Sequence, residues 1–95
     1  MEKQEVITKV VQAVVQVQDA SGRPSGDIGP ATRPVRDVEG FDSLSGVEAT
    51  VVLSESLGVD IPDDYNPFVS MDGERSLSVG EIADNLCTLV GAEAK

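Results

Sequence analysis

The sequence contains no histidine and no tryptophan, one cysteine and only three aromatic residues. Without histidine, Ser-His and Cys-His catalysis is excluded, and the most common metal ligand is missing. The single cysteine, Cys87, can form neither an internal disulfide nor a thiol metal cluster, and its place at the edge of an apolar stripe indicates a structural thiol. The sequence therefore predicts a protein that is not an enzyme and has no metal site.

Basic residues are also few, with seven Lys and Arg against seventeen Asp and Glu, which gives a formal net charge of −10. Thirteen of the seventeen acidic residues lie in residues 37–95, where Arg75 and Lys95 are the only basic ones. Such a surface repels nucleic acid, and it favours protein partners that carry basic patches.

Long apolar runs are absent, since none approaches the roughly 20 residues that span a bilayer. The first five residues lack the basic and then apolar pattern of a signal peptide, so we expect a cytoplasmic protein that does not associate with membranes. A chain of 95 residues predicts a single domain over 1–95, too small for a deep enclosed active site. We expect a monomer, although a valine seam on the first helix would also suit a homodimer.

Three segments have the apolar spacing of helices, and they predict an all-α bundle with main helices at about 3–19, 43–57 and 79–90. Residues 15–18 alternate in polarity, which is also compatible with a strand. Ser78 and Glu81 form a capping box before the last helix, Gly91 is expected to end it, and residues 92–95 are expected to fray. The first helix carries its apolar residues at three- and four-residue offsets, at Val6, Ile7, Val10, Val11, Val14 and Val15.

The helix at 43–57 has an N-cap residue, Asp42, and a serine, Ser43, in its first turn. Backbone N–H groups are unpaired there and the helix dipole favours negative charge, so a phosphate ester on Ser43 would be stabilised. Gly58 and Pro62 are expected to end the helix. Its apolar residues fall on two faces, with Leu44, Val47 and Val51 on one and Ala49, Val52, Leu53 and Leu57 on the other.

Two connecting segments have no helical period. Residues 20–36 contain three prolines and three glycines and predict a long loop, which is either mobile or held by anchors such as Ile28 and Val35. We interpret its three arginines as charges on a solvated linker; the alternative is that the loop reaches a partner or covers the Ser43 end of the second helix. Residues 63–66 are compatible with one short helical turn before Pro67, and Phe68 and Met71 are expected to anchor the segment that follows.

The motif Asp42-Ser43-Leu44, with Glu48 six residues after Asp42 and the ending Leu57-Gly58-Val59-Asp60-Ile61-Pro62, resembles the acyl carrier protein family. The resemblance implies that a phosphopantetheinyl transferase attaches a 4′-phosphopantetheine arm from coenzyme A to Ser43, between Asp42 and Leu44. The thiol of the arm would hold acyl groups as thioesters for acyl-transferring or condensing enzymes. The alternative is an adaptor of the same fold that acts unmodified and binds a partner through the second helix.

Two further sets of residues follow from the two-faced helix and the aliphatic core. We expect partners to bind at Leu44, Val47, Glu48, Val51 and Glu55. We expect a loaded acyl chain to enter the bundle between the second and last helices, in a cavity lined by Val47, Val51, Ile61 and Leu86. Gly46 in an early helix position, Ser54, Ser56 and the long first loop depart from the family's usual pattern. They indicate a specialised fatty-acyl, polyketide or peptide pathway.

Overall fold

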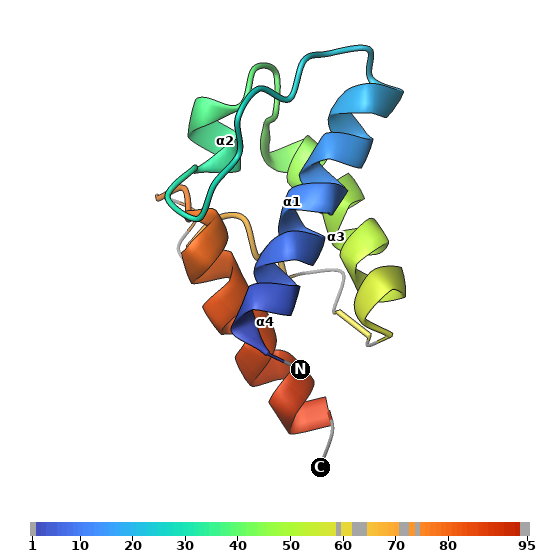
Figure 1. Ribbon diagram of the computed structural model, residues 1–95, viewed down its shortest axis with the longest axis vertical. Coiled ribbons are helices and arrows are strands. Elements are labelled where there is room, and N and C mark those ends of the chain that lie inside the picture. Colours follow the sequence, from blue (N-terminus) through green and yellow to red (C-terminus); the bar gives the residue numbers. More distant parts are fainter. Residues whose placement is uncertain (1, 59, 62–64, 71–72, 74, 94–95) are drawn as a thin grey trace.

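The computed structural model describes residues 2–58, 60–61, 65–70, 73 and 75–93, and for residues 90–93 it describes the backbone alone. The helices are α1 (Lys3–Ala20), α2 (Pro34–Asp37), α3 (Ser43–Leu57) and α4 (Val79–Glu93). α1 packs against both α3 and α4, and it lies between them in Figure 1. The described residues form no strand beyond an isolated bridge between Val69 and Ser76, so the predicted all-α fold is confirmed. No described helix is long and apolar enough to cross a membrane.

The core is built around one face of α1, where Val6, Val10, Ala13 and Val14 are fully buried. These positions repeat every three or four residues, so their side chains share one stripe of the helix. α1 stays helical to Ala20, and the strand alternative for its last turn is wrong. The same core receives buried side chains from the rest of the chain, at Val38, Phe41, Ala49, Leu53, Leu57, Phe68, Leu77, Val79, Ile82, Ala83 and Leu86.

The capping box that begins α4 is confirmed. Ser78 Oγ accepts a hydrogen bond from the Glu81 N–H at 3.2 Å, and Glu81 Oε1 accepts one from the Ser78 N–H at 2.9 Å. The prediction that Gly91 ends this helix was wrong, because α4 continues through Gly91 to Glu93. A glycine inside a helix costs about 1 kcal/mol relative to alanine, and Ala92 and Glu93 are good helix formers that continue the helix beyond it. Ala94 and Lys95 of the predicted frayed tail lie outside the described residues.

The segment at 20–36 is held against the bundle. Its carbonyls at Pro30 and Thr32 accept hydrogen bonds from the first N–H groups of α4, Gly80 N at 2.9 Å and Val79 N at 2.8 Å. Ile28 and Val35 pack against the core, as expected of anchors. The prediction of a loop throughout 20–36 missed α2, which begins at Pro34; proline suits the first helical position because its φ is already fixed there.

The connection from α3 to α4 contains no helix among residues 65–70, 73 and 75–78. The short helical turn expected at 63–66 falls largely on Asp63 and Asp64, which lie outside the described residues, as does Met71. Phe68 is fully buried, which confirms it as an anchor, and its carbonyl accepts a hydrogen bond from Leu77 N at 3.0 Å.

Candidate functional site

Asp42 caps α3, as the sequence predicted. Its backbone is extended, and its Oδ1 accepts hydrogen bonds from Ser45 N at 2.9 Å and from Ser45 Oγ at 3.2 Å. The bond from the Ser45 N–H, together with weaker bonds from the Ser45 hydroxyl and nearby backbone groups, lowers the pKa of the Asp42 carboxyl below its ordinary value. The carboxylate is therefore ionised at neutral pH and satisfies one of the free donors at this helix end.

Ser43 is the first residue of α3, and it is exposed. Its carbonyl accepts a hydrogen bond from Asn66 Nδ2 at 3.2 Å, so a residue from the α3–α4 connection supports the backbone beneath it. A fixed backbone with an exposed hydroxyl gives an external enzyme access to the oxygen without any change in the fold. No sequence pattern indicated Asn66, because its contact with Ser43 joins residues 23 positions apart.

The same connection packs closely against the first turn of α3. Asn66 Oδ1 accepts a hydrogen bond from Phe68 N at 3.0 Å, and the rings of Phe68 and Phe41 lie 5.4 Å apart between centroids. A Cβ atom on Gly46 would lie 3.1 Å from Asn66 Oδ1 and 3.4 Å from Phe68 Cβ. Gly46 therefore marks a close approach of two segments, which explains why a glycine occupies this early helix position.

The outer face of α3 is apolar and exposed, which confirms the two-faced helix. Leu44, Val47 and Val51 expose 68%, 45% and 58% of their surface, whereas Ala49 and Leu53 on the inner face are fully buried. The acidic residues of the predicted partner-binding set, Glu48 and Glu55, are exposed as well. All five residues of that set thus lie at the surface of one helix.

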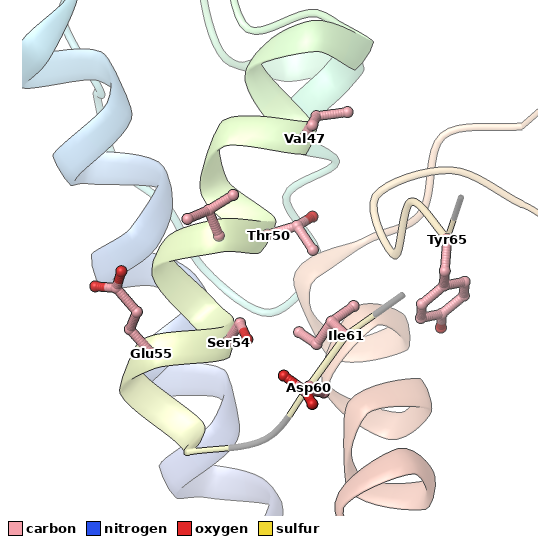
Figure 2. A pocket seen from close by; sticks show the side chains of 8 residues that line it. Val47, Thr50, Ser54, Glu55, Asp60, Ile61 and Tyr65 are labelled. Carbon is pink, nitrogen blue, oxygen red and sulfur yellow. The ribbon is translucent and has the colours of Figure 1, made fainter. Parts of the chain in front are cut away.

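A hollow of about 370 Å³ lies beside this face, between α3 and the segment that follows it. Its volume falls within the range of small-ligand sites. In Figure 2, Val47 and Thr50 project from α3, while Ile61 and Tyr65 come from the following segment. We call this the α3 hollow, and its lining residues are Val47, Thr50, Val51, Ser54, Glu55, Asp60, Ile61 and Tyr65.

The α3 hollow brings together three of the four residues expected to line an acyl-chain cavity, namely Val47, Val51 and Ile61. Leu86, the fourth, does not line it, because it is fully buried in the core. The expectation placed the cavity between the second and last long helices, but α4 packs against α1 and its apolar side chains are used there. Glu55 and Asp60 are exposed at the hollow, and burial raises the pKa of the Tyr65 hydroxyl above its ordinary value.

An arginine from the first long loop reaches the N-terminus of α3. Arg23 Nη2 donates a hydrogen bond to Ser45 Oγ at 3.4 Å. A second arginine of the loop, Arg33, donates from Nη1 to the Ser76 carbonyl at 2.9 Å. The interpretation of these arginines as charges on a solvated linker is therefore wrong for Arg23 and Arg33, and only Arg36 of the three is exposed. Such contacts leave no periodic signal in the sequence.

A curated acyl carrier protein from Acidothermus cellulolyticus is 36% identical to this chain over 64 residues, which cover 67% of this chain and 71% of that protein. The chain belongs to the acyl carrier protein family. No family model matches the chain, and no solved structure matches it. Members of this family are carriers rather than enzymes, and they work with acyl-processing enzymes.

The family generally carries phosphopantetheine, and the residues around Ser43 fit such a group. The serine is exposed on the first turn of a 15-residue helix, where free N–H groups and the helix dipole stabilise a phosphate. On the same helix turn, Arg23 Nη2 contacts Ser45 Oγ, and Arg23 Nε is buried without a hydrogen-bond partner. A positive group at the first turn of the helix suits an anionic ester there.

Proposed function

We propose that this protein carries acyl groups as thioesters on a 4′-phosphopantetheine arm attached to Ser43. The observation that carries the proposal is an exposed serine at the first position of a capped helix, in a chain of the acyl carrier family. When bound, the arm supplies the thiol that forms the thioester. The chain's own part is to present Ser43 and to stabilise the phosphate at the α3 N-terminus.

Attachment is a transfer from coenzyme A. Ser43 Oγ forms a bond to the phosphorus that bears the pantetheine, the pyrophosphate P–O bond breaks, and adenosine 3′,5′-bisphosphate leaves. The serine proton passes to a base of the transferase, since this chain has no histidine to accept it. Asp42 is already engaged by Ser45 as the helix cap, so its role is to hold the helix end that presents Ser43.

The outer face of α3 is the proposed docking surface for the transferase and the acyl-processing enzymes. Leu44, Val47 and Val51 offer exposed apolar contacts, and Glu48 and Glu55 add negative charge. A basic patch on the partner would be attracted to this face, and the apolar residues would be buried on contact. The docking face and Ser43 belong to one helix, so a bound enzyme meets the arm at its point of attachment.

The α3 hollow is the proposed site for the loaded acyl chain, with Val47, Val51 and Ile61 as its apolar wall. Each methylene removed from water contributes about 0.8 kcal/mol. Leu86 is not part of this wall. Glu55 and Asp60 are exposed at the hollow, so their carboxylates would remain in water when an acyl chain lies against α3.

We further propose a specialised fatty-acyl, polyketide or peptide pathway and a cytoplasmic monomer. The first is supported by Gly46, Ser54, Ser56 and the long first loop, which depart from the family's usual pattern. The second is supported by the composition and by the burial of the α1 valines within the domain's own core.

The test is incubation of the purified protein with coenzyme A and a promiscuous phosphopantetheinyl transferase. The intact mass should rise by one phosphopantetheine group, and Ser43→Ala should fold but show no gain. An unchanged mass under conditions that modify another carrier protein would overturn the proposal. It would favour an unmodified adaptor, for which the exposed apolar face of α3 would be the binding surface.

A further inference from the structure

We propose that Arg23 binds the phosphodiester of the arm on Ser43 and thereby fixes the arm's root at the N-terminus of α3. The inference rests on the proposed attachment to Ser43. It assigns a role to the long first loop, from which Arg23 contacts the N-terminus of α3. Arg23 lies outside the motif that contains Ser43, 20 residues before it in the chain.

The backbone around Arg23 is fixed by a fully buried glutamine at the end of α1. Gln18 O accepts a hydrogen bond from Arg23 N at 2.9 Å, and Gln18 Nε2 donates to the carbonyls of Pro24 at 2.9 Å and Glu39 at 2.7 Å. One side chain thus ties the start of the loop to the turn that leads into α3. These hydrogen bonds hold the backbone at Arg23 in place, although the residue lies in a loop.

The side chain of Arg23 then crosses the backbone of Gly40. A Cβ atom on Gly40 would contact Arg23 Cδ and would lie 2.5 Å from Nε, closer than any side chain permits. Gly40 also has a φ of +72°, which favours glycine. Because Gly40 has no side chain, Arg23 can pass over it toward the first turn of α3, where its Nη2 contacts Ser45.

Arg23 forms no direct ion pair with a described residue, and the Asp42 carboxylate meets it only through the shared Ser45 hydroxyl. Among the described residues, the ion pairs are those of Lys3 with Asp84 and Arg75 with Glu81, and Arg23 has none. Its hydrogen bond to Ser45 Oγ is long, at 3.4 Å, and its Nε is buried without a partner. Gln18 Oε1 is also buried without a partner; a bond between it and Nε would still leave the terminal nitrogens free to bind a phosphate.

The guanidinium contacts the first turn of α3, to which Ser43 also belongs. Arg23 meets residues 40 and 45, on either side of Ser43 in the chain, and the proposal requires its long side chain to turn from the side where Ser45 is buried to the side where Ser43 is exposed. A charge-assisted bond from arginine to a phosphate oxygen is shorter and stronger than a bond to a neutral hydroxyl. The terminal nitrogens would therefore turn from Ser45 to the phosphodiester once it is present.

The test compares apo and modified forms of wild type, Arg23→Gln and Arg36→Gln. Arg36 is the matched control, because it lies in the same segment, carries the same charge and is exposed. Modification should raise the melting temperature of wild type and Arg36→Gln by about 2–5 °C, and this rise should disappear in Arg23→Gln. The phosphorus NMR resonance of the diester should shift in Arg23→Gln alone, and salt should reduce the wild-type rise.

A second measurement uses the wild type alone, so that it does not depend on the folding or modification of a variant. In proton–nitrogen spectra, the Arg23 Nε–H resonance should move on modification, while that of Arg36 should stay. If it does not move, or if modification stabilises all three proteins equally, Arg23 only supports Ser45 and the inference is wrong. If the wild type takes no arm at all, the proposed function has failed instead, and the mass spectrum separates these two outcomes.

Discussion

Single residues decide how Ser43 is presented. Asp42 follows the ordinary preference for a capping residue, and its role was readable from the sequence because the capped N–H lies only three residues away. The contacts of Asn66 and Arg23 could not be predicted from the sequence, since each residue reaches the first turn of α3 from more than 20 residues away. Local rules of helix ends thus predicted the cap, while the supporting contacts depend on the packing of distant segments.

Gly40 offers a test of the contact with Arg23. Gly40→Ala should lower the free energy of unfolding by more than Gly22→Ala, although both glycines have φ values near +70°. The backbone strain in each should cost about 1–2 kcal/mol. At Gly22 a Cβ meets nothing within 4 Å, whereas at Gly40 it meets the Arg23 side chain. Urea unfolding measures the difference, and equal losses would show that Arg23 does not lie across Gly40.

At the scale of elements, α3 has one face for the core and one for partners. The sequence predicted both faces from helical periodicity, and the exposed fractions confirm them. The long helices were also predicted closely, because their apolar spacing is strong. The prediction was wrong at two irregular positions. It missed α2, which lies in a proline-rich segment, and it ended the last helix before Gly91, whereas α4 continues through Gly91. Composition alone does not tell a glycine that ends a helix from one that the helix tolerates.

The two faces of α3 should respond differently to truncation. Leu53→Ala removes a fully buried side chain and should lower the free energy of unfolding by about 2–5 kcal/mol. Leu44→Ala, at a residue that is 68% exposed, should change it by less than about 0.5 kcal/mol but slow transfer by the phosphopantetheinyl transferase. Chemical denaturation and initial rates of modification measure the two effects. A large loss of stability in Leu44→Ala would contradict the assigned face.

The Glu81 carboxylate at the start of α4 should make the free energy of unfolding depend on pH. The Ser78 N–H bond, and then the Arg75 side chain, lower the pKa of Glu81 from its ordinary value of 4.5 to about 2. A pKa lowered by folding stabilises the protein above pH 4.5, and this stabilisation is lost as the pH falls toward about 2. Glu81→Gln should flatten the stability profile in that window, and Arg75→Gln should flatten it less, because the Ser78 bond remains. Unfolding curves from pH 2 to 7 that are unchanged in Glu81→Gln would contradict this.

At the scale of the molecule, charge is distributed unevenly. Thirteen acidic residues lie from residue 37 onward, while residues 1–36 carry four acidic and five basic residues. The contacts of Arg23 and Arg33 show that part of the basic charge in the first long loop is used within the protein. The acidic character of α3 and the following segment was evident from the sequence; the way in which the loop brings positive charge to the Ser43 end was not.

Reversal of one surface charge tests whether partners are attracted to α3. Glu48→Lys should slow modification by the transferase and weaken its dependence on salt, because a screened attraction has been removed. Glu5→Lys is the matched control, since Glu5 is also exposed but lies on α1, away from Ser43. Equal rates for the two variants at low salt would place the docking surface elsewhere.

We propose that Ser43, and no neighbouring hydroxyl, bears the arm. The most direct measurement is fragmentation mass spectrometry of the modified protein, which locates the added phosphopantetheine within the segment that contains both Ser43 and Ser45. Ser43 is exposed, whereas Ser45 is 7% exposed and its hydroxyl is bonded to Asp42, so the account predicts the group on Ser43 alone and its retention in Ser45→Ala. Localisation to Ser45, or modification that persists in Ser43→Ala, would contradict it.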